Sequence, residues 1–236
     1  MKISNESIPT SCPEAEIFES VLSLNGQNIL ELGCGDSALT RLIATTGDNR
    51  VITATEVDEV QHKKNQLIDD LPNVSFALAG SEDIPAGNDS FDVVFMFKSL
   101  HHVPEHLMKK ALQEVKRVLK PNGIAYISEP IFTGEFNEIL RLFHDEEKVR
   151  KAAFDALETA VNEQEFILMD ELFFNAPMIF ADFEQYAEKV IGVTHSDHQL
   201  SDELYECVKQ KFELTFAKNA GNFLIPIRVD LLQKNA

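Results

Sequence analysis

The stretch NILELGCGDS, residues 28–37, decides how this chain folds. Residues 28–32 form a short apolar run of the length of a buried strand, and Gly33 and Gly35 follow directly. Glycine lets the backbone turn tightly from a strand into a helix, and it lets a ligand approach the main chain closely. The stretch therefore predicts a strand, a ligand-binding turn and a helix over residues 37–45.

Strand and helix patterns alternate after that turn at the rhythm of a parallel α/β sheet. Further runs that are apolar or β-branched predict strands over residues 51–57, 74–80, 91–97, 123–128 and 223–233. Helical spacing of apolar residues predicts helices near residues 13–22, 58–71 and 104–119. Pro226, inside the last run, indicates a strand near a sheet edge or one that begins after a break.

The rhythm changes after residue 130. Phe136, Ile139, Leu140 and Phe143 stand at helical spacing, which predicts a helical cap over about residues 131–185. We expect one domain over residues 1–236, with a core of about residues 13–130 and 186–236. The carboxyl ends of the strands are where open α/β sheets bind ligands, so we expect the cap to lie there.

The overall charge of the chain indicates which classes of binding partner are disfavoured. The chain has 39 Asp and Glu against 21 Lys and Arg, a net charge of −18, which disfavours nucleic acids and anionic membranes. Cys12, Cys34 and Cys207 lack the spacing of a metal site or a disulfide framework. The first residues are polar and no apolar run is long enough for a membrane span, so we expect a cytoplasmic protein.

Two kinds of cofactor fit the glycine turn. Gly33, Gly35 and Ala38 satisfy a dinucleotide-binding pattern, and Glu56 lies where an acid that binds the NAD ribose belongs. Glu31, however, would oppose a pyrophosphate and suits a ligand that carries an ammonium and a sulfonium. The segment after the third predicted strand is also acidic, because Ser81 is followed there by Glu82 and Asp83, and it would likewise suit a cationic ligand.

Five segments together make a resemblance specific. They are ELGCGDS (31–37), the isolated Glu56, GSEDIP (80–85), FDVVFMFKSLHHVP (91–104) and LKPNGIAYISEP (119–130). In order and spacing, over roughly residues 15–130, they resemble the class I S-adenosylmethionine-dependent methyltransferases, above all the small-molecule enzymes. The resemblance implies an α/β, Rossmann-like, doubly wound sheet. Its seven strands would be mostly parallel, with an antiparallel C-terminal strand and the helical cap inserted after strand five.

The resemblance also implies which residues hold the cofactor. It implies that Glu56 accepts both ribose hydroxyls and that Glu31 holds the methionine end. Lys98 is expected to pair with Glu31 or to reach an anionic group of the substrate. The implied cofactor-binding set is Glu31, Gly33, Cys34, Gly35, Ser37, Glu56, Ser81, Glu82 and Lys98. This sequence departs from the pattern at Ser37, where a third glycine often lies, and at Gly80, where an aspartate is frequent.

The implied reaction is a direct displacement, in which a small hydrophobic or aromatic acceptor takes the methyl group from S-adenosylmethionine. The product of the donor is S-adenosylhomocysteine, and no metal is expected to take part. His101 and His102 are candidate bases for a hydroxyl acceptor. Candidate substrate contacts are Glu129, Phe132, Phe136 and Phe143, although a Phe face at helical spacing also fits plain core. An NAD-dependent oxidoreductase and a non-catalytic S-adenosylmethionine-binding protein stay open as alternatives, as do a monomer and a homodimer.

Overall fold

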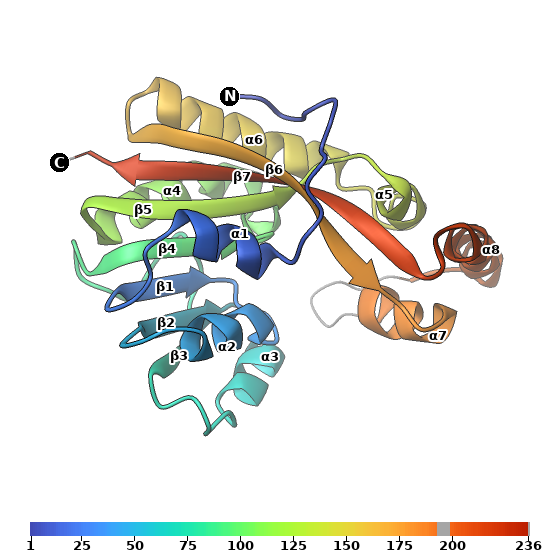
Figure 1. The fold of residues 1–236 in the computed structure, drawn as a ribbon, viewed down its shortest axis with the longest axis horizontal. Coiled ribbons are helices and arrows are strands. Elements are labelled where there is room, and N and C mark those ends of the chain that lie inside the picture. Colours follow the sequence, from blue (N-terminus) through green and yellow to red (C-terminus); the bar gives the residue numbers. More distant parts are fainter. Residues whose placement is uncertain (193–198, 236) are drawn as a thin grey trace.

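A seven-stranded sheet runs through the molecule in the order β3-β2-β1-β4-β5-β7-β6 (Figure 1). This computed structural model describes residues 1–192 and 199–235. Six strands run parallel, and β7 lies antiparallel between β5 and β6. The predicted α/β, doubly wound, mostly parallel sheet with an antiparallel C-terminal strand is therefore confirmed.

The strands and helices follow one another in alternation through the first half of the chain. The strands are β1 (Asn28–Leu32), β2 (Val51–Glu56), β3 (Val74–Leu78), β4 (Phe91–Phe97), β5 (Leu119–Pro130), β6 (Phe166–Ile179) and β7 (Asn222–Lys234). The described helices are α1 (Glu14–Val21), α2 (Ala38–Thr45), α3 (Glu59–Asn65), η1 (Leu100–His102), α4 (Glu105–Val118), α5 (Glu135–Leu140), α6 (Glu147–Asn162), α7 (Phe183–Tyr186), η2 (Ala187–Ile191) and α8 (Asp202–Asn219). None of these described helices is long and apolar enough to cross a bilayer.

Helices cover both faces of the sheet, which explains why β4 is almost wholly apolar. Successive side chains of a strand point to opposite faces. Val94 and Met96 accordingly pack with α4 and α6, while Val93 and Phe95 pack with α1 and α2 on the other face. These two apolar layers hold the strand ends in place.

A third apolar cluster lies beyond the sheet, where β6 and β7 extend past their neighbours and meet α5, α7 and α8 (Figure 1). Its members are largely aromatic: Phe136, Phe180, Phe183, Tyr186, Phe212 and Phe223. We call these six residues the aromatic cluster. The rings contact one another edge-on and stacked, with Phe212 and Phe223 at 5.3 Å between centroids.

The extent predicted for the helical cap was wrong. Residues 166–179, placed within the cap, form strand β6 at the sheet edge, and α6 packs against α4 on the sheet face. Conversely, α8 was predicted as part of the domain core of residues 186–236, but it contributes Phe212 to the aromatic cluster. The alternation that marks a strand is broken in β6, because its pairing with β7 shifts register between Leu168 and Asp170.

Pro226 does not mark an edge strand, because β7 has a neighbour on each side. Pairing with β5 ends at Ile227, opposite Pro130, so Pro226 lies just past the last ladder pair on that side. Its carbonyl accepts a hydrogen bond from the Ile131 amide at 2.8 Å. A proline is tolerated there because the strand needs no N–H donor at that position.

Candidate functional site

A cavity of about 770 Å³ opens at the carboxyl ends of β1, β2 and β4. Parallel strands end at the same edge of a sheet, so residues distant in sequence meet there. Of the predicted cofactor residues, six line this cavity: Gly33, Gly35, Glu56, Ser81, Glu82 and Lys98. Glu31, Cys34 and Ser37 lie outside its lining.

The turn after β1 has three residues in the left-handed region: Gly33 at φ 74°, Gly35 at φ 52° and Ser37 at φ 65°. A Cβ on Gly33 would also stand 2.9 Å from the Cβ of Ser99, so side chains are excluded there by both backbone and space. Around Gly35 a Cβ would meet nothing within 4 Å. The turn therefore offers bare backbone to the cavity, and Ser37 shows why a glycine is often found at its position.

Glu56 ends β2, and its carboxylate is held by three backbone amides. Its Oε2 accepts a hydrogen bond from Gly35 N at 2.8 Å, and its Oε1 accepts bonds from Val57 N at 2.7 Å and Asp58 N at 2.9 Å. These bonds tie the end of β2 to the glycine turn. A rigid carboxylate on the cavity wall is suited to bind paired hydroxyl groups.

Glu31 and Cys34 lie behind the turn. Glu31 is 2% exposed and accepts a hydrogen bond from Thr40 Oγ1 at 2.6 Å. Burial raises the pKa of its carboxyl to about 8, although the Thr40 bond and the charge of Lys98 act in the opposite direction. Burial likewise raises the pKa of the Cys34 thiol to about 12, which keeps that thiol protonated and inert.

Lys98 has a partner that sequence reasoning missed. Its Nζ donates to Glu14 Oε2 at 2.5 Å, so the side chain pairs with α1 and not with Glu31 as one hypothesis required. Glu14 belongs to no recognised motif, and only the fold brings α1 beside the end of β4. Lys98 still lines the cavity.

His101 is buried between two carboxylates. Its Nδ1 lies 2.5 Å from Glu129 Oε2, and its Nε2 lies 3.6 Å from Glu146 Oε1. Burial alone would lower the pKa of His101, but the charges and hydrogen bonds of Glu129 and Glu146 raise it to about 9. The other oxygen of Glu129 accepts the Leu100 amide at 2.9 Å.

The two histidines therefore occupy different positions. His102 lines the cavity, and its ring centroid lies 4.1 Å from that of His101, which does not line it. Glu129, predicted as a substrate contact, lies outside the lining with its carboxylate bonded to His101. Glu146, the second acid on His101, was missed because it lies in a separate segment before α6.

The predicted aromatic substrate contacts lie elsewhere. Phe132 lies under the guanidinium of Arg141, at 4.9 Å from the ring centroid, and Phe136 and Phe143 pack in or against the aromatic cluster. None of these three rings lines the cavity. Among the described residues after Pro130, Gly192 lines the cavity.

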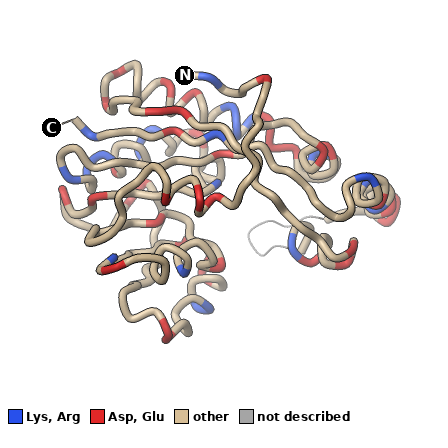
Figure 2. The backbone as a smooth tube through the Cα atoms, viewed as in Figure 1, with Lys and Arg blue, Asp and Glu red and all other residues tan. Residues whose placement is uncertain are grey.

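The charge of the cavity favours a cationic ligand. Four carboxylates line it, on Asp36, Glu56, Asp58 and Glu82, against the single ammonium of Lys98 among the described lining residues. Such a lining repels a pyrophosphate and attracts a sulfonium or ammonium. The sequence as a whole has 39 Asp and Glu against 21 Lys and Arg, and Figure 2 shows both kinds dispersed along the described part of the chain.

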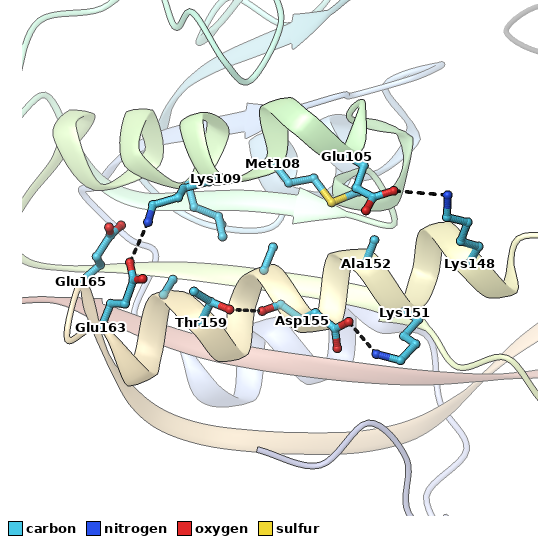
Figure 3. Close-up of a pocket in the computed structure, with 13 residues that line it drawn as sticks. Glu105, Met108, Lys109, Lys148, Lys151, Ala152, Asp155, Thr159, Glu163 and Glu165 are labelled. Atoms are coloured by element: carbon cyan, nitrogen blue, oxygen red, sulfur yellow. Dashed lines mark hydrogen bonds and ion pairs between the residues drawn. The ribbon is translucent and has the colours of Figure 1, made fainter.

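A second cavity, of about 380 Å³, lies between α4 and α6, away from the strand ends (Figure 3). Apolar side chains such as Met108 and Ala152 form its floor. Ion pairs cross its rim, with Lys109 2.8 Å from Glu163 and Lys148 3.6 Å from Glu105. Because it holds none of the predicted site residues, we place the candidate site at the strand ends.

Known proteins resemble this chain in sequence over part of its length and in fold over nearly all of it. Residues 29–123 match the family model of a methyltransferase domain. An O-methyltransferase, rstn1, from Aspergillus nomiae is 31% identical over 138 residues, which cover 55% of this chain and 59% of that protein. The chain thus spans less than two thirds of this relative's length.

Solved structures share the fold over nearly the whole chain. The YcgJ protein from Bacillus subtilis has a TM-score of 0.65 at 17% identity, with 94% of this chain and 98% of that chain covered. A phosphoethanolamine N-methyltransferase 2 from Haemonchus contortus, solved with S-adenosylhomocysteine and phosphomonomethylethanolamine, has a TM-score of 0.56 at 17% identity. There the match covers 94% of this chain and 52% of that one. At these identities the likeness concerns the fold.

Proposed function

We propose that this chain belongs to the class I S-adenosylmethionine-dependent methyltransferases and transfers a methyl group from S-adenosylmethionine to a small-molecule acceptor. The observation that carries the proposal is the cavity at the strand ends, where Glu56 is fixed against the glycine turn within an acidic lining.

The cofactor would lie along the ends of β1, β2 and β3. Glu56 would accept hydrogen bonds from both ribose hydroxyls, which only a carboxylate does well with its two oxygens. The bare backbone of Gly33 and Gly35 would carry the methionine part, and Ser81 with Glu82 would edge the adenine. The acids of the lining would stabilise the positive charges of the ammonium and the sulfonium.

The reaction disperses charge. A nucleophilic atom of the acceptor attacks the methyl carbon, the bond from methyl to sulfur breaks, and neutral S-adenosylhomocysteine leaves. The protein therefore contributes mainly by holding donor and acceptor in line and by excluding water. The relative from Aspergillus nomiae is described as an O-methyltransferase, which favours a hydroxyl as the acceptor group here.

A hydroxyl acceptor must also lose its proton. We assign the activation of the acceptor to the His102 side of the cavity, because His101 is buried and bonded to Glu129. In this arrangement Glu129 and His101 position the loop that carries His102. A hydrophobic acceptor would enter beside Val103 and Pro104, which line the cavity next to His102.

The test is transfer of labelled methyl from S-adenosylmethionine to a panel of hydroxylated aromatic and aliphatic small molecules. We expect label in at least one acceptor and loss of that transfer in His102→Ala. Binding of S-adenosylhomocysteine without transfer to any acceptor would instead identify a non-catalytic binding protein. Tight NADH binding without S-adenosylhomocysteine binding would identify an oxidoreductase.

A further inference from the structure

We propose that His101, His102 and Glu146 form a site for one divalent transition-metal ion, with zinc the best chemical match, on the acceptor side of the cavity. The ligand atoms that these three residues offer all lie within 4.8 Å of one another. Imidazole nitrogens and a carboxylate oxygen are ligands that zinc accepts readily. This proposal replaces the expectation of a metal-free enzyme.

The spacing of the ligand atoms fits a metal with little rearrangement. Ligands about 2.1 Å from a tetrahedral zinc ion lie about 3.4 Å from each other. His101 Nε2 and Glu146 Oε1 are already 3.6 Å apart. The remaining adjustment would fall to His102, which is the exposed member of the three.

The surrounding residues orient the two buried ligands. Glu129 Oε2 lies 2.5 Å from His101 Nδ1 and keeps the proton on that nitrogen, so an ion would displace the proton on Nε2 and bind there. Arg150 donates to Glu146 Oε2 from Nη2 at 2.5 Å and from Nε at 3.1 Å, which leaves Oε1 toward His101. His144 Nε2 lies 3.0 Å from Oε1, and this contact is the one that an ion would displace or share.

The position of the site suggests its use. Three protein ligands leave a coordination position for an exogenous oxygen, as catalytic zinc sites do. Since His102 lines the cavity, an ion bound to it would be reached from the space where the acceptor would bind. The ion would lower the pKa of an acceptor hydroxyl; the O–H bond breaks, its proton passes to solvent, and the oxygen attacks the methyl carbon as the methyl–sulfur bond breaks. This role rests on the proposed function, whereas metal binding does not.

The test is titration of the full chain, first stripped with a chelator, with Co²⁺ as a visible-absorption probe and with Zn²⁺ in competition with a coloured chelator. We expect one ion per chain. His102→Ala and Glu146→Gln should weaken binding by at least roughly tenfold, and Glu129→Gln by roughly 10–100-fold. His106→Ala, an exposed histidine in the same segment, is the matched control and should bind as the wild type does.

Binding of S-adenosylhomocysteine is measured on the same samples, because it reports an intact cofactor site and tests the proposed function separately. Retained cofactor binding with lost Co²⁺ binding in His102→Ala supports the metal site. The metal proposal is overturned if the wild type binds no ion, or if His102→Ala and Glu146→Gln bind as tightly as His106→Ala. Failure to bind S-adenosylhomocysteine would count against the proposed function alone.

Discussion

The part of the chain from β1 to β5 and the part from α5 to β7 differ in what holds them and in what they contribute. The first part carries the glycine turn, Glu56 and almost the whole cavity lining, and it includes the residues that match the methyltransferase domain model. The second part adds two strands, α6 and the aromatic cluster, and among its described residues it contributes Gly192 to the cavity.

This difference follows from the task of each part. The proposed cofactor would require one particular backbone geometry, and such geometry demands particular residues, such as Gly33 with its positive φ and its close approach to Ser99. Burial alone imposes only apolar character, which many sequences satisfy. The first part therefore carries recognisable motifs, while the second part carries aromatic residues whose role becomes visible only in the fold.

The largest effect that would test this separation concerns Phe212, which is 1% exposed at the centre of the aromatic cluster. Phe212→Ala leaves a cavity there and should lower the free energy of unfolding by about 3–5 kcal/mol. Hydrogen exchange should locate the lost protection in α5, α7 and α8. S-adenosylhomocysteine affinity, measured by calorimetry, should change little. If Phe212→Ala lowered the affinity for S-adenosylhomocysteine as well as the free energy of unfolding, the two parts of the chain would not be independent.

Glu56→Gln should act on the other part. It replaces a carboxylate oxygen that accepts backbone N–H bonds and that we expect to bind ribose, so affinity for S-adenosylhomocysteine should fall roughly 10–100-fold. Calorimetric titration measures the loss. Glu59→Gln, on exposed α3 next to Lys63, is the matched control and should bind normally. Unchanged affinity in Glu56→Gln would remove Glu56 from the site.

Two glycines of equal φ separate backbone strain from lack of space. Gly33 and Gly26 both have φ 74°, but a Cβ meets Ser99 at 2.9 Å only at Gly33, with nothing within 4 Å at Gly26. Urea denaturation should show a loss of about 1 kcal/mol for Gly26→Ala and about 2 kcal/mol or more for Gly33→Ala. Equal losses would mean that the close approach to Ser99 adds nothing.

A fourth effect, which accumulates gradually with pH, concerns the stability that the buried Glu31 contributes. Burial raises the pKa of Glu31 from 4.5 to about 8, so the folded chain binds more protons than the unfolded chain within this window. Stability from this group is therefore present below pH 4.5 and is lost as pH rises through 8. Relative to Glu31→Gln, the wild type should lose up to about 1.4 kcal/mol per pH unit there. Parallel stability curves of the two proteins would contradict the raised pKa.

Local constraints explain which features could be predicted from the sequence. The glycine turn, the position of Glu56 and six of the seven strands depend on short runs of residues, and the structure has them where expected. The missed features depend on pairs far apart in the chain. Lys98 meets Glu14 through α1, His101 meets Glu146 before α6, and β6 shifts register against the distant β7 between Leu168 and Asp170.

The measurement that tests the central claim most directly is thermal unfolding with S-adenosylhomocysteine and with NADH, side by side on the same preparation. We predict stabilisation by S-adenosylhomocysteine alone, worth about 2.7 kcal/mol at a hundredfold excess over its Kd, and no shift with NADH. A shift with NADH and none with S-adenosylhomocysteine would contradict the assignment of the cavity at the strand ends to S-adenosylmethionine.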